Sequence, residues 1–400
     1  MHPARDGQLR PEHLPRPPNV AVIGGGIAGV TAAVALAERG VEVQLLEREQ
    51  QLGGRLRGWP TTLADGTAAT MTRGFHAFFR QYYNLRALLR RADPHGRALT
   101  TLTDYPLVDA HGHRDSFKGL PRTPPWNALA FALTSPTFRW RDLVTRIDAV
   151  AALPLIDVSV PDVYRRLDDQ DAVTFLQRVR FPEAAQHLAF SVFSRSFFAD
   201  PAELSAAELA TMFHIYFLGS SEGLVFDVPV EPFLQAVWEP MGRHLADIGV
   251  QVRTGTGVDE VTPGRDRRFL VRSRDGVEVD AVVLATDVRG LQTLLAASPE
   301  LGEASWRERI TGLRTAPPFL VSRLWLDTPV RPDRPGFLGT SGFGPVDNVS
   351  VLERFEGEAA RWAQRTGGSV VELHAYALTG DPEQAKRRLV AELRTIYPET

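Results

Sequence analysis

The chain has 400 residues, of which 44% are hydrophobic and 23% charged, and its formal net charge is -3. This composition is typical of a globular protein with two or three domains, and it excludes global disorder. The absence of cysteine excludes disulfides, thiolate metal sites and a cysteine nucleophile, so any redox chemistry requires a bound cofactor. The slight acidic excess argues against a nucleic-acid-binding surface.

The first nineteen residues contain five prolines and are predicted to be a disordered tail. They lack the apolar core of a signal peptide. No apolar stretch is long enough to span a bilayer, since the nearest, residues 149–160, contains Pro154 and Asp157. We therefore expect a cytoplasmic protein.

A βαβ unit is predicted after the tail. Residues 20–23 form a short apolar run suited to a buried parallel strand, and an Ala-rich helix is expected over residues 30–39. A second strand is expected over residues 41–46, with Glu47 at its end. The three segments together make a βαβ unit of about thirty residues.

The rest of the chain is predicted to be mainly helical over residues 75–240, with strands from residue 250. Asp275-Gly276 is a two-residue hairpin signal between apolar runs. The last hundred residues combine strand-like runs at 318–326 and 369–378 with a polar helix at 382–396.

The connection between the first strand and helix carries Gly24-x-Gly26-x-x-Gly29, with Ile27 and Ala28 between its last two glycines. This spacing permits a tight turn, close approach of a pyrophosphate and close helix–strand packing. The helix N-terminus offers N–H groups to phosphate. Glu47 lies eighteen residues after Gly29, where a carboxylate accepts ribose hydroxyls and disfavours the 2′-phosphate of NADP. NAD and FAD remain.

Residues 20–57, which include Gly53-Gly54-Arg55, resemble the FAD-binding N-terminus of the flavin amine oxidase and carotene desaturase superfamily. The resemblance implies an α/β fold, in which an FAD-binding Rossmann-like (GR2-type) domain is interleaved with an α+β substrate domain. We expect FAD-binding parts at 20–110 and 236–292, a largely helical substrate domain at 111–235, and its second part at 293–400. FAD contacts are expected from Gly24, Gly26, Ile27, Ala28, Gly29, Glu47, Arg48, Gly53, Gly54 and Arg55.

A second FAD segment is expected from the same resemblance. Val258 takes the place of the residue that contacts the adenine, and Ala285 ends the strand that returns to the cofactor. The alternative for Val258 is an ordinary β residue of the core.

Residues 73–79, Arg-Gly-Phe-His-Ala-Phe-Phe, resemble the plant-type carotene desaturases. Later stretches, at 104–107, 120–125, 193–201 and 212–223, resemble the carotenoid φ-ring (isorenieratene) synthase branch. The resemblance places Gly74, Phe75 and His76 at the flavin and makes His76 and Arg73 candidate catalytic residues. For His76 the alternative is a buried, hydrogen-bonded core histidine, and no metal site is expected.

The branch's reaction aromatises the β-ring of β-carotene and moves a methyl group from C1 to C2. The expected partners are a hydrophobic carotenoid, a quinone or oxygen as electron acceptor, and a membrane surface on which the protein docks peripherally. Alternatives are a phytoene or ζ-carotene desaturase, a carotenoid ketolase, a flavin amine oxidase, and a flavin- or carotenoid-binding protein without turnover. The sequence contains no match to the superfamily's final FAD segment. We therefore expect a fragment of a longer protein, and the alternative is impaired FAD binding.

Overall fold

The computed structural model describes residues 16–104, 106–124, 126–134, 147–148, 150–181, 199, 201–222 and 225–400. Most of the predicted tail, residues 1–15, lies outside the described residues, as does most of the 193–201 stretch. The last residue assigned to the tail, Asn19, is instead the first residue of a strand. Its backbone N–H donates to Asp280, which fixes it at the edge of the fold.

The chain divides into two compact units, each built from separated segments. Unit 1 comprises residues 1–73, 84–98 and 231–315, and unit 2 comprises residues 74–83, 99–230 and 316–400. The predicted domains differ from this division in two ways: residues 74–83 and 99–110 were assigned to the first domain but belong to unit 2, and residues 231–235 and 293–315 were assigned to the substrate domain but belong to unit 1. Strand pairing accounts for the first difference, since the strand at Leu107 pairs with one near the C-terminus.

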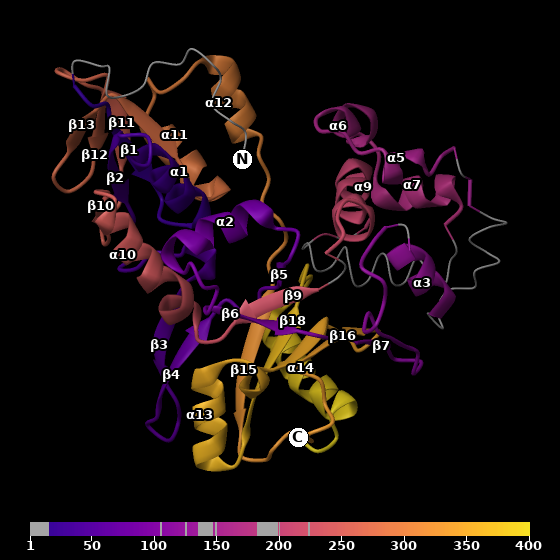
Figure 1. Ribbon diagram of the computed structural model, residues 1–400. Coiled ribbons are helices and arrows are strands. Elements are labelled where there is room, and N and C mark those ends of the chain that lie inside the picture. The colour runs from indigo at the N-terminus through magenta and orange to yellow at the C-terminus, as the bar shows by residue number, and fades with distance from the viewer. Residues whose placement is uncertain are drawn as a thin grey trace. The chain divides into compact units, whose positions relative to one another are not determined.

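Unit 1 is an α/β unit (Figure 1). Its elements, with α2 starting one residue before the unit boundary, are β1 (Asn19–Ile23), α1 (Ile27–Ala37), β2 (Glu42–Leu46), η2 (Gly54–Leu56), β3 (Gly58–Thr62), β4 (Ala68–Thr72), α2 (Tyr83–Ala92), η5 (Leu234–Trp238), α10 (Glu239–Asp247), β10 (Gln251–Arg253), β11 (Glu260–Pro263), β12 (Phe269–Arg272), β13 (Val277–Val279), β14 (Ala281–Leu284), α11 (Val288–Ala297) and α12 (Ala304–Thr311).

Four parallel strands in the order β10-β2-β1-β14 form the main sheet of unit 1. The predicted βαβ unit is confirmed as β1–α1–β2, and the predicted hairpin is confirmed as β12–β13. Because β1 is central, its residues 20–23 are buried on both faces, which explains the continuous apolar run. The predicted Rossmann-like class is therefore correct for this unit.

Unit 2 contains a mixed six-stranded sheet and a set of helices. Its elements are β5 (Phe78–Phe79), β6 (Leu99–Leu102), β7 (Leu107–Asp109), β8 (Arg114–Asp115), α3 (Trp126–Thr134), α5 (Leu153–Ile156), α6 (Asp162–Leu167), α7 (Ala172–Val179), α9 (Ala206–Phe213), η4 (His214–Leu218), β9 (Phe226–Pro229), β15 (Leu320–Leu326), β16 (Phe337–Ser341), β17 (Asn348–Val351), η6 (Leu352–Arg354), α13 (Gly357–Thr366), β18 (Ser369–Ala375) and α14 (Pro382–Ile396).

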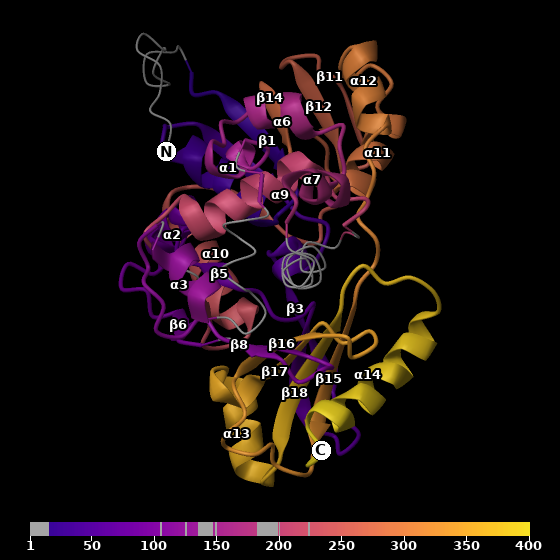
Figure 2. The ribbon, with the colours of Figure 1, turned by 90° about the vertical axis from the view of Figure 1, so that its right-hand side faces the viewer.

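The sheet of unit 2 has the order β15-β18-β17-β16-β7-β8. Figure 2 shows α13 and α14 on either side of its C-terminal strands. The odd-numbered residues of β18, such as Leu373, share a core with Leu389 and Leu393 of α14. The even-numbered residues therefore face the other side of the sheet. The α14 boundaries match the predicted helix at 382–396.

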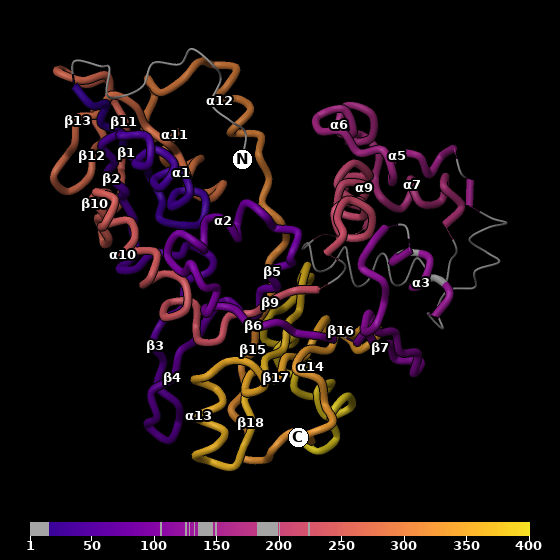
Figure 3. The backbone as a smooth tube through the Cα atoms, viewed as in Figure 1, coloured from indigo at the N-terminus to yellow at the C-terminus, as the bar shows by residue number. Residues whose placement is uncertain are grey.

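The mainly helical prediction for residues 75–240 was wrong in part, because β5 to β9 lie in this range. These strands are only two to four residues long, and all except β8 pair with distant partners, as β7 does with β16 (Figure 3). A strand that short shows no clear period in its own sequence, so only its pairing defines it.

Candidate functional site: the glycine turn and the buried network

The turn between β1 and α1 brings the predicted cofactor-binding glycines together. A Cβ on Gly29 would lie 1.8 Å from the Gly24 carbonyl oxygen, so only glycine allows this close packing of helix on turn. A Cβ on Gly24 would lie 2.6 Å from the oxygen of Ala285, which places the end of β14 directly against the turn. The Ala285 N–H donates to Ile23, extending the parallel pairing to this point.

The N-terminus of α1 has the properties of an anion site. No side chain caps it at Gly26, and its first turn contains no acidic residue. Ile27 and Ala28 supply backbone N–H groups of that first turn, which have no partner within a helix. Together with the positive end of the helix dipole, these groups suit a pyrophosphate.

Glu47 is buried at the end of β2. Its Oε2 accepts a hydrogen bond from Gly25 N–H at 2.6 Å, and its Oε1 accepts one from Glu49 N–H at 2.8 Å. Each carboxylate oxygen keeps further acceptor capacity for a ribose hydroxyl. The next residue, Arg48, is exposed and lies 3.5 Å from the Glu49 carboxylate.

The second glycine segment packs on the first. Gly53 N–H donates to the Gly25 carbonyl, and a Cβ on Gly54 would lie 3.1 Å from the Gly26 Cα. Arg55 is exposed.

A residue that the sequence did not single out supports this arrangement. Trp238 of the π-helical η5 lies against Gly53 and donates its indole N–H to the Leu56 carbonyl at 2.9 Å. A π-helical turn is rare and is enriched at functional sites, but it has no signal in the sequence.

Val258 is half-buried and packs against the core formed by β11, β12 and β13. The segment before it is held against β2, since Thr256 N–H donates to the Glu47 carbonyl. The core packing matches the alternative weighed for this residue. A role toward adenine stays a prediction.

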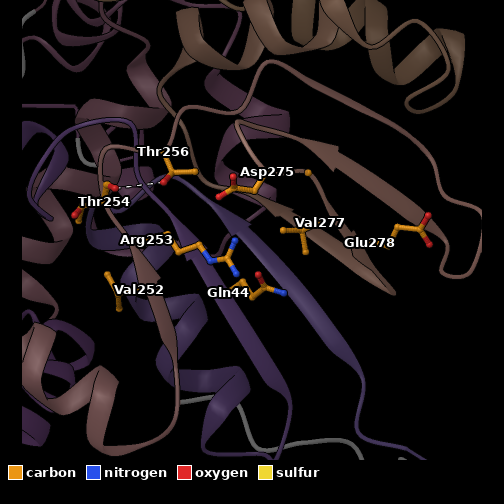
Figure 4. A pocket seen from close by; sticks show the side chains of 9 residues that line it. Gln44, Val252, Arg253, Thr254, Thr256, Asp275, Val277 and Glu278 are labelled. Atoms are coloured by element: carbon orange, nitrogen blue, oxygen red, sulfur yellow. Dashed lines mark hydrogen bonds between the residues drawn. The ribbon is translucent and has the colours of Figure 1, made fainter.

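Figure 4 shows an open groove in unit 1, lined by Gln44, Val252, Arg253, Thr254, Thr256, Asp275, Gly276, Val277 and Glu278. None of the predicted cofactor-binding residues lines it. The buried Gln44 Oε1 has no hydrogen-bond partner among the described residues. The groove is thus distinct from the glycine turn.

The remaining predicted residues lie where the chain passes from a segment of unit 1 to a segment of unit 2. Arg73 is exposed and ends a segment of unit 1, whereas Gly74, Phe75 and His76 begin unit 2. The His76 Nδ1 lies 2.8 Å from the Gly74 carbonyl oxygen. Because a carbonyl only accepts, Nδ1 carries the proton, and the lone pair of the neutral ring is on Nε2.

Unit 2 also contains a network of ionisable residues that the sequence did not single out. We call Arg323, Glu372, His374 and Tyr376 the buried network; its residues come from β15, β18 and the end of β18. Arg323 donates to Glu372 Oε2 through Nε at 2.9 Å and Nη2 at 2.7 Å. The His374 ring bridges Glu372 and Tyr376, at 2.8 and 2.6 Å.

The electrostatics of the buried network follow from this pairing. Burial by itself raises the pKa of the Glu372 carboxyl, but the Arg323 charge and the His374 hydrogen bond outweigh it and lower this pKa to about 2. Burial raises the pKa of Tyr376, so its hydroxyl stays protonated and can donate. The sequence does contain a signal for this network, because Glu372, His374 and Tyr376 occupy alternate positions in a mainly apolar run.

None of the helices formed by the described residues combines the length and the apolar composition that a membrane span needs. No group of three or more histidine, aspartate or glutamate side chains is arranged there to hold a metal ion.

The βαβ unit, the uncapped helix N-terminus and the buried Glu47 define a dinucleotide-binding protein, and these residues fit the adenosine and pyrophosphate of FAD. Residues 27–400 match the model of the flavin containing amine oxidoreductase family, and the chain belongs to this family. It is an FAD-dependent oxidoreductase.

Among its relatives, the carotenoid phi-ring synthase of Streptomyces griseus is 64% identical over 386 residues, covering 96% of this chain and 74% of that protein. The carotenoid phi-ring synthase of Chlorobaculum tepidum is 26% identical, covering 97% of this chain and 79% of the relative. The zeta-carotene desaturase of Synechocystis is 26% identical, covering 72% of this chain and 60% of the relative.

A solved structure of putrescine oxidase bound to putrescine matches with a TM-score of 0.65 at 17% identity, covering 94% of this chain and 81% of that one. A putative protoporphyrinogen oxidase from Exiguobacterium matches with a TM-score of 0.60 at 18% identity, covering 96% and 84%. These likenesses support the fold.

Proposed function

We propose that this enzyme aromatises the β-ring of a carotenoid such as β-carotene, with migration of a methyl group from C1 to C2. The observation that carries the proposal is the 64% identity to a carotenoid phi-ring synthase over almost the whole chain. Converting a cyclohexene ring to an arene removes four hydrogens, as two hydrides and two protons. FAD, when bound, supplies the hydride acceptor for such a substrate.

The chain's own residues have three tasks in this reaction. The glycine turn and Glu47 hold the cofactor, and Gly53, Gly54 and Arg55 extend that binding surface. His76 is the proposed base: with its Nδ1–H on the Gly74 carbonyl, it accepts a proton from the ring at Nε2. Arg73 is retained as a second candidate catalytic residue on the strength of the motif alone.

Aromatic side chains supply the third task, the exclusion of water and the stabilisation of positive charge. In unit 2, Phe75 lies 4.7 Å from Phe337 and 5.7 Å from Phe226, measured between ring centroids. Phe79 and Tyr216 continue the cluster, with centroids 4.7 Å apart. Aromatic faces stabilise a cation without acting as nucleophiles, as methyl migration requires.

The decisive experiment expresses the chain in bacteria that accumulate β-carotene, ζ-carotene or phytoene and separates the pigments by chromatography. Conversion of β-carotene to a product with aromatic rings is expected. Consumption of ζ-carotene or phytoene with β-carotene unchanged would instead favour the chain desaturases, to which the Synechocystis relative belongs.

The base assignment has its own control. His76→Gln should lower turnover by about 100-fold or more while the flavin spectrum stays that of the parent protein. His95→Gln removes an exposed histidine of unit 1 and should leave turnover unchanged. Full activity of the His76 variant would remove this residue from the mechanism.

We also propose peripheral docking on a membrane, where a carotenoid is dissolved. Helix α3 buries Asn127 and Phe131 but exposes Trp126, Leu129 and Leu133, at 61%, 48% and 59% of their surface. Residues 116–134 include Lys118 and Arg122 but no acidic residue. An apolar helix face with a tryptophan and flanking cations suits an anionic lipid surface.

Co-sedimentation with vesicles of anionic and of neutral lipid tests this surface. Replacing Trp126, Leu129 and Leu133 by serine should reduce binding to anionic vesicles at least tenfold. Leu313→Ser removes an equally exposed leucine from unit 1 and should leave binding unchanged. Equal binding of both variants contradicts the α3 surface.

The electron acceptor is proposed to be a membrane quinone or oxygen. Anaerobic turnover with and without an added quinone separates the two.

A further inference from the structure

The buried network ends on the segment that carries the proposed base. The Phe75 backbone N–H donates to Glu372 Oε1 at 2.6 Å, although the two residues are far apart in the sequence. The His374 ring lies against Gly74: a Cβ on Gly74 would meet His374 Nε2 and Cε1 at 2.6 Å. Gly74 has a φ of 99°, which side chains rarely adopt, so both space and backbone require glycine here.

The hydrogen bonds of the network can be given directions when the Phe75 N–H is assigned to Glu372, at 2.6 Å, rather than to His374 Nε2, which lies 3.2 Å from the same nitrogen. Glu372 is a carboxylate and can only accept, so His374 donates to it from Nε2. His374 Nδ1 then carries the lone pair and accepts from the Tyr376 hydroxyl. That hydroxyl accepts in turn from the Asn348 side-chain amide at 3.0 Å. The ring of His374 is therefore hydrogen-bonded at both nitrogens.

The network is also anchored against movement. Arg323 and Glu372 are directly opposite each other in the β15–β18 pairing, and their side chains are 3% and 0% exposed. Glu356 lies 3.7 Å from the same guanidinium. A buried ion pair costs desolvation and is a weak source of net stability, so its presence in this sheet calls for another explanation.

We propose that the buried network is a positioning device: it fixes the backbone of Gly74 and Phe75, so that His76 keeps its Nδ1–H on the Gly74 carbonyl and Nε2 remains its basic nitrogen. His374 and Glu372 are positioning residues in this sense, and His76 alone is the candidate that touches substrate. The inference rests on the proposed function only for the role of His76 in turnover.

Tyr376→Phe is the sharpest variant, because it removes one oxygen atom from the far end of the network. Without the Tyr376 hydroxyl, His374 Nδ1 loses its partner and only Glu372 still holds the ring, so the packing of the ring against Gly74 and Phe75 becomes less rigid. Tyr397→Phe is a matched control in unit 2. Tyr397 is also buried, but its hydroxyl has no hydrogen-bond partner among the described residues.

The first measurement uses the 400-residue chain without added substrate. Nitrogen NMR of histidine-labelled protein should show the Nδ1–H tautomer for His76 and the Nε2–H tautomer for His374, with the His76 signals assigned by their loss in His76→Gln. In Tyr376→Phe, the Nδ1 signal of His374 should move because it loses its hydrogen bond, its Nε2–H tautomer should persist on Glu372, and His76 should show a mixture of tautomers. Backbone exchange of residues 74–76, measured by mass spectrometry, should become at least tenfold faster in this variant and stay unchanged in Tyr397→Phe.

The second measurement is turnover of β-carotene, in which Tyr376→Phe should lower kcat about tenfold and leave KM unchanged. The two measurements separate the possible failures. Expected NMR and exchange results without any turnover of β-carotene by the parent protein would overturn the proposed function and leave the positioning device intact. The opposite tautomer in the parent protein, or unchanged exchange in Tyr376→Phe, would overturn the positioning device even if β-carotene is converted.

Discussion

The glycine turn of unit 1 and the buried network of unit 2 both hold a short backbone segment in place, but they do so through different kinds of contact. The turn is local: Gly24, Gly29 and Glu47 lie within about one βαβ unit, and backbone groups make most of its contacts. The network is non-local: Phe75 meets Glu372 from almost the other end of the chain, and charged side chains make its contacts. The glycine turn is therefore preorganised by the geometry of the backbone, whereas the buried network is preorganised by paired charges.

The largest effect should come from breaking the charge pairing. Glu372→Ala leaves Arg323 buried without its main partner and should cost about 3–5 kcal/mol of unfolding free energy. Glu399→Ala removes a carboxylate that pairs with Arg334 near the surface and should cost about 1 kcal/mol or less. Denaturant titration of both variants measures the contrast. Equal losses would mean that burial adds nothing to the network's importance.

Acid titration tests the pair of Arg323 and Glu372 in the parent protein, without a substitution. The folded-state pKa of Glu372 is about 2, below the ordinary 4.5, so its contribution is fully present above pH 4.5 and is lost as the pH falls from 4.5 toward 2. The denaturation midpoint of the parent protein should fall through this window. Glu372→Gln, which cannot titrate there, should show a shallower fall. Parallel profiles would contradict the lowered pKa.

Two glycine variants test the local device. Gly29→Ala places a methyl group 1.8 Å from a backbone oxygen and should cost about 1–3 kcal/mol or more even without FAD. A methyl group at Gly26 meets no atom nearer than 3.8 Å, so Gly26→Ala should leave the stability of the FAD-free protein within about 0.5 kcal/mol of the parent. Its FAD affinity should nonetheless fall at least tenfold. Unchanged FAD binding by Gly26→Ala would contradict the assigned cofactor site.

The smallest effect should come from Thr286, next to Ala285. Its buried hydroxyl has no hydrogen-bond partner among the described residues. Thr286→Val should change the stability of the FAD-free protein by about 0.5 kcal/mol or less. A loss above 2 kcal/mol would show that the hydroxyl has a partner in solution.

The glycine turn and the buried network also differ in how well they can be predicted from the sequence. Glycine spacing between a strand and a helix has a backbone explanation, and the turn, Glu47 and the hairpin at Gly276 follow from local residues. The polar helix over 382–396 follows from its own capping aspartate and period. Residues such as Trp238 and Arg323 could not be found in this way, since their contacts depend on strand order and on a π-helical turn. The alternation of Glu372, His374 and Tyr376 predicts a polar face of a strand, but it does not predict which residues that face contacts.

Strand order also has a consequence for synthesis on the ribosome. In unit 1, β1 is made near the start of the chain but needs β14, about 260 residues later, to complete its sheet. At about 5–20 residues per second, β1 waits roughly 10 to 50 s for that neighbour. In unit 2, β7 waits similarly for β16. Unit 1 is complete in sequence only at residue 315 and unit 2 only at residue 400, so both expose apolar strand edges during translation and are expected to need chaperone protection in that interval.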